Sequence, residues 1–332
     1  MNFSKENPPT NILPNGLAEA DIDKAITKSG YPLQLIIGEK LRKRFHCQDE
    51  WSYIDSDSHE IRTMDILASA RLYTFDNDNQ PRVRPELNLL IECKQSDLPY
   101  IFFLTPDKIF TNDFPLVAGL FSKNLKVVSD YDPSSWHFSV IHALQLQEQE
   151  FLNGDVPTCF TFSKCVRKGP DVILSGTDGY NNLVLPLLKA LKHFDASEVP
   201  PKTAHYFDAH LCLAIGVLDA PMIGVTVTET GHISKLLPCV RVYRHDSIEH
   251  KDWSQRSKLS AIDLVHKDYF DQYMEEKVIP FAKRYSELVL KHGTVLAEGK
   301  AFVKGMGDNS WTDIEPRLTE YSLLKKRIMP KL

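Results

Sequence analysis

Apolar residues near the start of the chain recur at the three- and four-residue spacing of an amphipathic helix. The pattern predicts helical structure over residues 20–46, in two pieces that are divided at the Ser-Gly-Tyr-Pro run of residues 29–32. Proline suits the first turn of the second piece, because the missing N–H would have no partner there. The apolar stripe of this second helix consists of Leu33, Ile36, Ile37 and Leu41.

Strand-like segments follow, in which apolar and β-branched residues are bounded by turn-forming residues. They predict strands over residues 51–54, 61–75 and 87–93, and a short apolar segment, YIFFL, continues at 100–104. The connections between the first three are rich in Asp, Ser and Asn, as in DSDSHE and DNDNQP. These segments therefore predict a meander of three neighbouring strands.

The remainder of the chain alternates between helical and strand-like patterns. Residues 133–151 are expected to form one helix capped by Ser134 or Ser135. Further expected elements are strands within 210–228 and 235–246, a strand at 260–266, and helices over 183–194 and 270–293, the last with a kink at Pro280. This order favours one mixed α/β domain rather than two. We expect that domain over residues 19–332, with an insertion around 105–160 and a flexible arm over 1–18.

The composition narrows the class of protein. A chain of 332 residues that is 42% hydrophobic and 25% charged is typical of a globular protein with a sizeable core. The formal net charge of −5 means that any nucleic-acid surface has to be a local patch. Six cysteines without a CxxC pair favour reduced, buried thiols over a zinc site. No segment resembles a signal peptide or a membrane span, so we expect a cytoplasmic protein.

The strand predicted over residues 87–93 ends in charged residues. Glu92 and Lys94 are two positions apart, so their side chains share a face of an extended chain. Asp65 lies in the otherwise apolar segment HEIRTMDILASARLYTF, and strand pairing could place it beside Glu92. Two carboxylates and the backbone carbonyl of Cys93 could hold Mg²⁺, with Lys94 helping to position a water for attack on a phosphodiester. The alternative is a metal-free ion pair of Lys94 with Glu92 or Asp65.

The Glu-x-Lys spacing by itself is weak support, because the chain contains it four times. The pair at 275–277 lies in a predicted helix, where positions two apart face different directions. The pair at 249–251 lies in a polar turn, and the pair at 298–300 has a central glycine and no preceding strand with an aspartate. Only Glu92 and Lys94 end a strand that follows an aspartate-bearing one.

The run KSGYPLQLIIGEKLRKRF…WSYIDSDSHEIRTMDILASARL…ELNLLIECKQSDLPYIFF resembles the core of the PD-(D/E)xK, or restriction-endonuclease-like, nuclease superfamily. It is similar to uncharacterised bacterial members with a Ser-Gly-Tyr-Pro helix, an Arg-x-x-Asp strand and a Glu-Cys-Lys strand. The match covers about residues 28–103, and later segments match more loosely. The resemblance implies an α/β fold with an αβββαβ core, in which a central mixed sheet is flanked by helices. It also implies Asp65 and Glu92 as ligands of Mg²⁺ or Mn²⁺, and Lys94 as the catalytic lysine.

The first helix departs from the pattern of this superfamily. Many such nucleases carry a glutamate there that supports the metal-bound water, and the corresponding residue in this chain is Gln34. An amide can hydrogen-bond that water but adds no charge. Glu39 is an imperfect substitute, because positions five apart lie about 140° around the helix axis. Ser96 is expected to border the site.

Basic residues at two places are candidates for contacts with a nucleic-acid backbone. They are Lys40, Arg42 and Lys43 at the end of the second helix, and Arg82 and Arg84 before the Glu-Cys-Lys strand. For the helix end we favour a solvated cluster that matches the helix dipole, and for the arginines an exposed loop is an equal alternative. Phosphate contacts would make binding salt-dependent without selecting a sequence.

The expected function is metal-dependent hydrolysis of phosphodiester bonds in DNA, with RNA as a weaker option. The resemblance makes a role in defence against foreign DNA, or in repair, reasonable. The alternative is a nuclease fold that has lost cleavage and binds nucleic acid or a protein partner. Gln34 and the acidic net charge favour the alternative, whereas Asp65, Glu92 and Lys94 oppose it. A homodimer is plausible, since cutting both strands usually takes two active sites.

Overall fold

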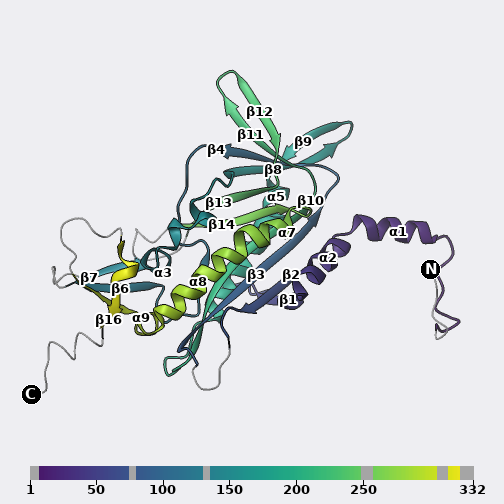
Figure 1. The fold of residues 1–332 in the computed structure, drawn as a ribbon. Coiled ribbons are helices and arrows are strands. Elements are labelled where there is room, and N and C mark those ends of the chain that lie inside the picture. Colours follow the sequence, from purple (N-terminus) through teal and green to yellow (C-terminus); the bar gives the residue numbers. More distant parts are fainter. Residues whose placement is uncertain (1–6, 75–79, 130–134, 248–256, 305–312, 322–332) are drawn as a thin grey trace, which may run out of the picture.

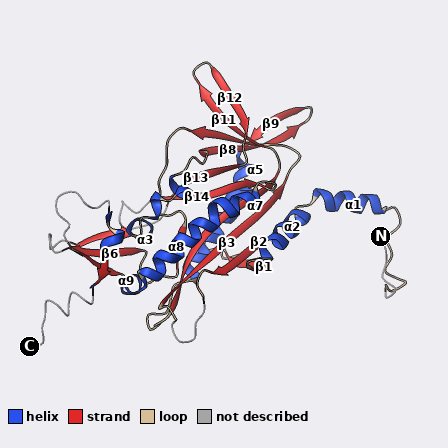
Figure 2. Ribbon diagram, viewed as in Figure 1, coloured by secondary structure: helices blue, strands red, loops and turns tan. Residues whose placement is uncertain are grey.

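The fold is mixed α/β, with a large mixed sheet flanked by helices and a second, smaller sheet beside it (Figures 1 and 2). The structure is a computed structural model that describes residues 7–74, 80–129, 135–247, 257–304 and 313–321. The helices are α1 (Glu19–Lys28), α2 (Tyr31–Arg42), α3 (Val140–Ala143), α4 (Glu150–Asn153), α5 (Gly176–Gly179), α6 (Leu185–Ser197), α7 (Phe270–Tyr273), α8 (Ile279–Lys291) and α9 (Gly293–Glu298).

Twelve strands of the described chain form the large sheet. They are β1 (His46–Ile54), β2 (Ile61–Arg71), β3 (Val83–Gln95), β4 (Tyr100–Thr105), β5 (Leu116–Ala118), β8 (Thr158–Lys168), β9 (Asp171–Ser175), β10 (Phe207–Asp219), β11 (Met222–Thr228), β12 (Gly231–Leu236), β13 (Cys239–Ser247) and β14 (Ser257–His266). Their order across the sheet is β1-β2-β3-β10-β14-β13-β8-β4-β11-β12, with β5 paired to β10 and β9 paired to β8.

The part of the large sheet that carries the candidate charges is built on the parallel pair β3 and β10, the third and fourth strands of the order. The two strands pair along their whole length, from Val83 beside Phe207 to Gln95 beside Asp219. Parallel strands need a crossover connection, and the chain between these two includes α6. Both strands are apolar over most of their length, which is the composition of strands covered on both faces. On the outer side of β3, the antiparallel strands β2 and β1 complete a meander.

Helices cover the two faces of this central region. On one face, Ile37 of α2 and Tyr285 of α8 belong to a buried cluster that also contains Leu89 and Ile91 of β3; we call it the α8-side core. On the other face, side chains of α6 and Leu90 of β3 belong to a second cluster, the α6-side core. Successive residues of β3 therefore point alternately to α8 and to α6, as a flat strand requires.

The small sheet consists of β16 (Leu318–Glu320), β15 (Lys300–Val303), β6 (Asn124–Ser129) and β7 (Ser135–Ser139), in that order. Val127 of β6 and Val303 of β15 belong to the α8-side core, so this apolar cluster continues from the large sheet into the small one. Residues 105–160, where an insertion was expected, contribute β5 to the large sheet and β6 and β7 to the small one. That they form an insertion into a single domain stays a prediction.

Most of the predicted elements are present; β1 and β3 are longer than predicted, whereas β2 ends at Arg71, before the predicted end at residue 75. The two-piece helix divides as expected, into α1 and α2. The helix expected over 133–151 is wrong, because that stretch contains β7 and then only short helical turns. The side chain that caps a helix there is Ser139, which accepts the N–H of His142; Ser135 begins β7, and Ser134 lies outside the described residues. Gln145 then takes a left-handed backbone conformation (φ 51°), which ends the helix.

Two prolines lie just inside long helices, and each follows a π turn. Pro280 in α8 follows the turn Met274–Val278, and Pro186 in α6 follows the turn Tyr180–Val184. A proline in a helix clashes with the carbonyl four residues before it, and the wider π turn relieves that crowding. The irregularity expected at Pro280 is therefore a π turn in the helix, immediately before the proline.

The N-terminal region extends away from the sheet (Figure 1). Residues 7–18 form turns and extended segments that are mostly exposed, and α1 has no buried residue. Residues 1–6 lie outside the described part, and the flexibility of the arm stays a prediction. All six cysteines are described, and none of them forms a disulfide. Among the described helices, none has the length and apolarity that crossing a membrane requires.

Gly216 of β10 offers a test of the packing around the central strands. A Cβ on Gly216 would lie 2.5 Å from Leu264 Cδ2 and 2.9 Å from Leu183 Cδ1, both fully buried. Because overpacking a dense core is unfavourable, we expect Gly216→Ala to lower the free energy of unfolding by about 1–3 kcal/mol. Urea denaturation measures this, with Gly293→Ala as the control because its Cβ would meet no atom within 4 Å. Equal stability of both variants would contradict the tight packing at β10.

Candidate functional site

The meander brings Asp65 of β2 beside Glu92 of β3. The last pair in the β2–β3 ladder is Ile66 with Ile91, so the next position in the same register places Asp65 opposite Glu92. Oδ2 of Asp65 accepts a hydrogen bond from the backbone N–H of Cys93, at 2.7 Å. This bond fixes the Asp65 carboxylate at the end of β3. The structure thus shows the proximity that strand pairing predicted.

Glu92 and Lys94 share a face of β3 and form an ion pair. The Glu92 side chain is only 7% exposed, and its Oε2 is buried without a hydrogen-bond partner. Burial raises the pKa of the Glu92 carboxyl to about 7, against the opposing effect of Lys94 and with a further increase from Asp65. A buried carboxylate oxygen without a donor is unfavourable, so this atom is suited to accept a cation or a proton.

The charge state of Lys94 limits the chemistry it can perform. Burial alone would lower the pKa of its ammonium group, but the adjacent Glu92 and Asp65 carboxylates outweigh that effect and the pKa is raised. Lys94 therefore stays protonated at neutral pH and cannot act as a general base there. For Asp65, burial raises the pKa, partly offset by the Cys93 N–H and by Lys94.

Helix α2 places Gln34 against the same group. Its side chain is buried, and Nε2 donates to the backbone carbonyl of Asp65 at 3.1 Å and to Oε1 of Glu50 at 2.9 Å. Glu39, the other candidate on this helix, has a side chain that is 76% exposed and pairs with Arg42 at 2.9 Å. The structure therefore brings Gln34 to the candidate site and leaves Glu39 on the outer surface of the helix.

Glu50 of β1 is a residue of this site that the sequence analysis missed. Its neighbours Asp49 and Trp51 pair with Ile66 and Met64, so the register sets Glu50 opposite Asp65. Its backbone is in the left-handed region, with φ 50°. The predicted strand began at Trp51, which left Glu50 in a turn; the acidic pair Asp49-Glu50 directly before that strand is the signal that could have identified it.

The face alternation of both outer strands changes at this position. In β2, Met64 belongs to the α6-side core and Ile66 to the α8-side core, although residues two apart normally share a face. In β1, Cys47 packs against the α8-side core and Trp51 against the α6-side core. The strand pair therefore turns over at Glu50 and Asp65, which sets these two carboxylates apart from the regular pattern of the sheet.

Two further predicted residues have local roles in the structure. The hydroxyl of Ser96 donates to the carbonyl of Leu98 and accepts its N–H, so it organises the turn after β3. The side chain of Cys93 is buried in the α8-side core, on the face opposite to Glu92, as predicted. Its carbonyl lies under the start of α2, where a Cβ on Gly30 would be 3.7 Å from the oxygen. A ligand role for this carbonyl stays a prediction.

The geometry fits a small cation held by few protein ligands. In the described part of the chain, no three His, Cys, Asp or Glu side chains lie close enough together to hold a metal ion. Asp65 and Glu92 nevertheless provide two adjacent carboxylates, one of which has the unpartnered Oε2. Mg²⁺ commonly binds through one or two carboxylates and keeps several waters, so this donor set suits it.

Most of the basic residues proposed to contact nucleic acid are already engaged within the protein. The ion pairs are Lys40 with Asp271, Arg42 with Asp49, and Arg84 with Asp208. Arg82 donates to the carbonyl of His205 at 3.3 Å, and Lys43 is exposed. A phosphate contact by any of the paired residues would have to compete with its carboxylate.

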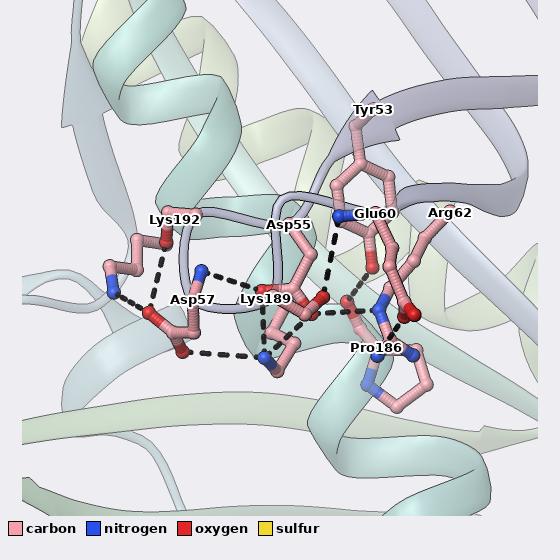
Figure 3. Close-up of polar contacts among 10 residues, drawn as sticks. Tyr53, Asp55, Asp57, Glu60, Arg62, Pro186, Lys189 and Lys192 are labelled. Atoms are coloured by element: carbon pink, nitrogen blue, oxygen red, sulfur yellow. Dashed lines mark hydrogen bonds and ion pairs between the residues drawn. The ribbon is translucent and has the colours of Figure 1, made fainter.

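An ion-pair network centred on the buried Asp55 attaches the β1–β2 turn to α6 (Figure 3). Asp55 has no exposed surface, and Lys189 of α6 donates to both of its carboxylate oxygens, at 2.6 and 2.7 Å. Arg62 of β2 donates to Asp55 from another side, at 2.7 Å. Asp57 extends the network to Lys192, at 2.6 Å. Burial would raise the pKa of the Asp55 carboxyl, but the Lys189 hydrogen bonds and charge hold it well below its usual range.

This network determines where the candidate site lies relative to the rest of the sheet. The hydroxyl of Tyr53 adds a bond from β1 to the carbonyl of Pro186 in α6, at 3.2 Å (Figure 3). Strands β1 and β2, which carry Glu50 and Asp65, are thus bonded at their turn to α6, the helix between β3 and β10 in the chain. We refer to Asp55, Asp57, Arg62, Lys189 and Lys192 as the hairpin brace.

Comparisons of this chain with protein-family models, with curated proteins and with solved structures give no match. The geometry of the site and the sequence motifs that it contains are therefore the observations that bear on function.

The hairpin brace predicts a stability that depends on pH. We expect Asp55→Asn to lower the free energy of unfolding at pH 7 by about 3–5 kcal/mol, because it leaves Lys189 without its buried partner. The folded-state pKa of Asp55 is depressed, so its contribution is complete above the unfolded pKa of about 3.9 and is lost as the pH falls further. The difference between wild type and Asp55→Asn, measured by urea denaturation, should therefore shrink below about pH 4.

Asp57→Asn is the matched control, since the Asp57 side chain is 58% exposed in its pair with Lys192. An exposed pair contributes about 1 kcal/mol or less. Equal losses in the two variants, or a difference that grows at low pH, would contradict the stabilising role assigned to Asp55.

Proposed function

We propose that this protein is a metal-dependent nuclease that hydrolyses phosphodiester bonds in DNA. The observation that carries the proposal is the arrangement at the end of β3, where Asp65 lies opposite Glu92 and Lys94 pairs with Glu92. The buried, unpartnered Oε2 of Glu92 supports a cation at this position. The chain order of α2, the β1-β2-β3 meander, α6 and then β10 parallel to β3 supports a restriction-endonuclease-like αβββαβ core.

Each residue of the site has a role that follows from its charge and position. Asp65 and Glu92 would hold Mg²⁺ or Mn²⁺, with the Cys93 carbonyl as a further oxygen ligand. When bound, the metal would supply Lewis-acid stabilisation and a more acidic water. Lys94 is protonated and 31% exposed, so it can reach a substrate phosphate and stabilise negative charge that develops on its oxygens. The proton of the attacking water has to go to a group other than Lys94.

A second candidate is a nuclease-like module that binds nucleic acid or a protein without cleaving. The pairing of Lys40, Arg42 and Arg84 with carboxylates favours it, because these cations are not free to contact phosphate. The Lys94 side chain favours cleavage instead, because it pairs with the buried Glu92 and is still 31% exposed, so a substrate phosphate could reach it. RNA as the substrate and a homodimeric assembly remain parts of the proposal that the same experiments address.

Replacement of Lys94 tests the proposal directly. We expect Lys94→Ala to fold and to bind metal, and to lose cleavage by about 100-fold or more, because it removes a positive charge used in the transition state. Purified proteins would be incubated with supercoiled, linear and single-stranded DNA and with RNA, in Mg²⁺, Mn²⁺ or EDTA. A pH near 8.5 is suitable, because loss of Lys94 would raise the pKa of Glu92 further.

Lys202→Ala, in the exposed loop before β10, is the control and should cleave like wild type. Equal cutting by wild type and Lys94→Ala would place the activity elsewhere or in a contaminant. Absence of cutting by both, together with measurable DNA binding, would favour the non-cleaving module. Size-exclusion chromatography with light scattering of the same samples gives the oligomeric state.

A further inference from the structure

Glu50 is an acidic residue held in an unfavourable backbone conformation at the edge of the candidate site. Left-handed conformations are normally taken by glycine, or by asparagine and aspartate, because a Cβ is crowded there. Glu50 has φ 50° within β1, directly opposite Asp65 in the register of the strand pair. Strained residues of this kind persist where the surrounding structure requires their side chain, and they are frequent at functional sites.

The contacts of Gln34 specify the orientation of Glu50. The amide nitrogen of Gln34 has two hydrogens; one bonds to the Asp65 carbonyl and the other to Oε1 of Glu50. Both donors are used, so the buried amide connects the Asp65 backbone to the Glu50 carboxylate. A glutamate at position 34 would instead set a second negative charge beside Glu50, which is unfavourable. A neutral glutamine at position 34 therefore suits this site, because Glu50 of β1 already provides a negative charge beside it.

Glu50 lies opposite Asp65 in the register of the strand pair, and Gln34 bonds to both residues, so the two carboxylates belong to the same corner of the site. Carboxylates that repel one another are stabilised by a divalent cation between them or near them. Glu50, Asp65 and Glu92 do not form a group of three direct ligands among the described residues. Mg²⁺ keeps several of its waters when bound to proteins, so a carboxylate at the edge of the site can hold such a water.

We propose that Glu50, oriented by Gln34, is the third acidic residue of the site and accepts a hydrogen bond from a metal-bound water. The proposal rests on the nuclease function proposed above. It assigns to a residue of β1 the charge that a helix glutamate would otherwise provide. Gln34 is then a positioning residue, which acts through Glu50 and through the Asp65 carbonyl.

Metal affinity tests this role without reliance on catalysis. Mn²⁺ binding to the full-length protein would be measured by isothermal titration calorimetry, with thermal unfolding of the metal-free protein in parallel. Glu50→Gln preserves an acceptor for Gln34 and removes only the charge. We expect its Mn²⁺ affinity to be weaker by about 10- to 100-fold, the loss typical of residues that support metal ligands, with little change in the metal-free melting temperature.

Glu39→Gln is the matched control, because it makes the same change of charge on the exposed side of α2. It should bind Mn²⁺ like wild type. Glu50→Asn is the second variant, since asparagine tolerates a left-handed backbone; it keeps the proposal testable if glutamine disturbs folding. Cleavage by Glu50→Gln should fall as well and recover in part at higher Mn²⁺ concentration.

The outcomes separate this inference from the nuclease proposal. If wild type binds Mn²⁺ and cleaves DNA, and Glu50→Gln and Glu50→Asn bind Mn²⁺ equally well, the role of Glu50 is wrong and the nuclease proposal stands. Equal weakening by Glu39→Gln and Glu50→Gln would also overturn the role, because it would reflect only the overall charge. If wild type neither binds Mn²⁺ nor cleaves, both proposals fail.

Discussion

Burial of β3 on both faces is the constraint on which the rest of the structure depends. With α8 on one side, α6 on the other and β10 paired along its whole length, β3 has little room for charge except near its two ends. Glu92 lies near the end of β3, where it is still buried enough for its pKa to rise to about 7. Lys94, two residues further on, is partly exposed. Asp65 joins them because its carboxylate bonds to the β3 backbone.

The hairpin brace and the site are two consequences of how the outer strands attach to this centre. Lys189, from the crossover helix α6, neutralises the buried Asp55 at the β1–β2 turn. In the middle of β1, the strand pair turns over at Glu50, and Gln34 of α2 bonds to both strands there. Helices on opposite faces of the sheet therefore hold the same hairpin at two points, and Glu50 and Asp65 lie at the point held by α2.

Local patterns in the sequence were sufficient to predict most strands and the group of charged residues at the end of β3. The two-residue spacing of Glu92 and Lys94 in a predicted strand was enough to place both side chains on one face. The prediction that this strand pairs with the preceding one was enough to place Asp65 beside Glu92. The brace was missed because DSDSHE has the composition of an ordinary polar turn, and its partner Lys189 is 134 residues away from Asp55 in the chain. The helix expected over 133–151 failed because pairing of β7 with β6 overrides the local preference. Glu50 was missed because its left-handed backbone leaves no mark on the amino-acid pattern.

The left-handed backbone of Glu50 also places a cost in stability at the residue proposed to hold a metal-bound water. Selection for thermal stability alone, in the laboratory or by consensus design, would favour glycine or asparagine there, because either residue relieves the crowding. Such a protein would be easier to purify and would melt later, but it would carry a less acidic site. Under the role proposed for Glu50, the strained glutamate is a cost in stability that accompanies metal binding, and engineering of this fold for robustness should leave that residue unchanged.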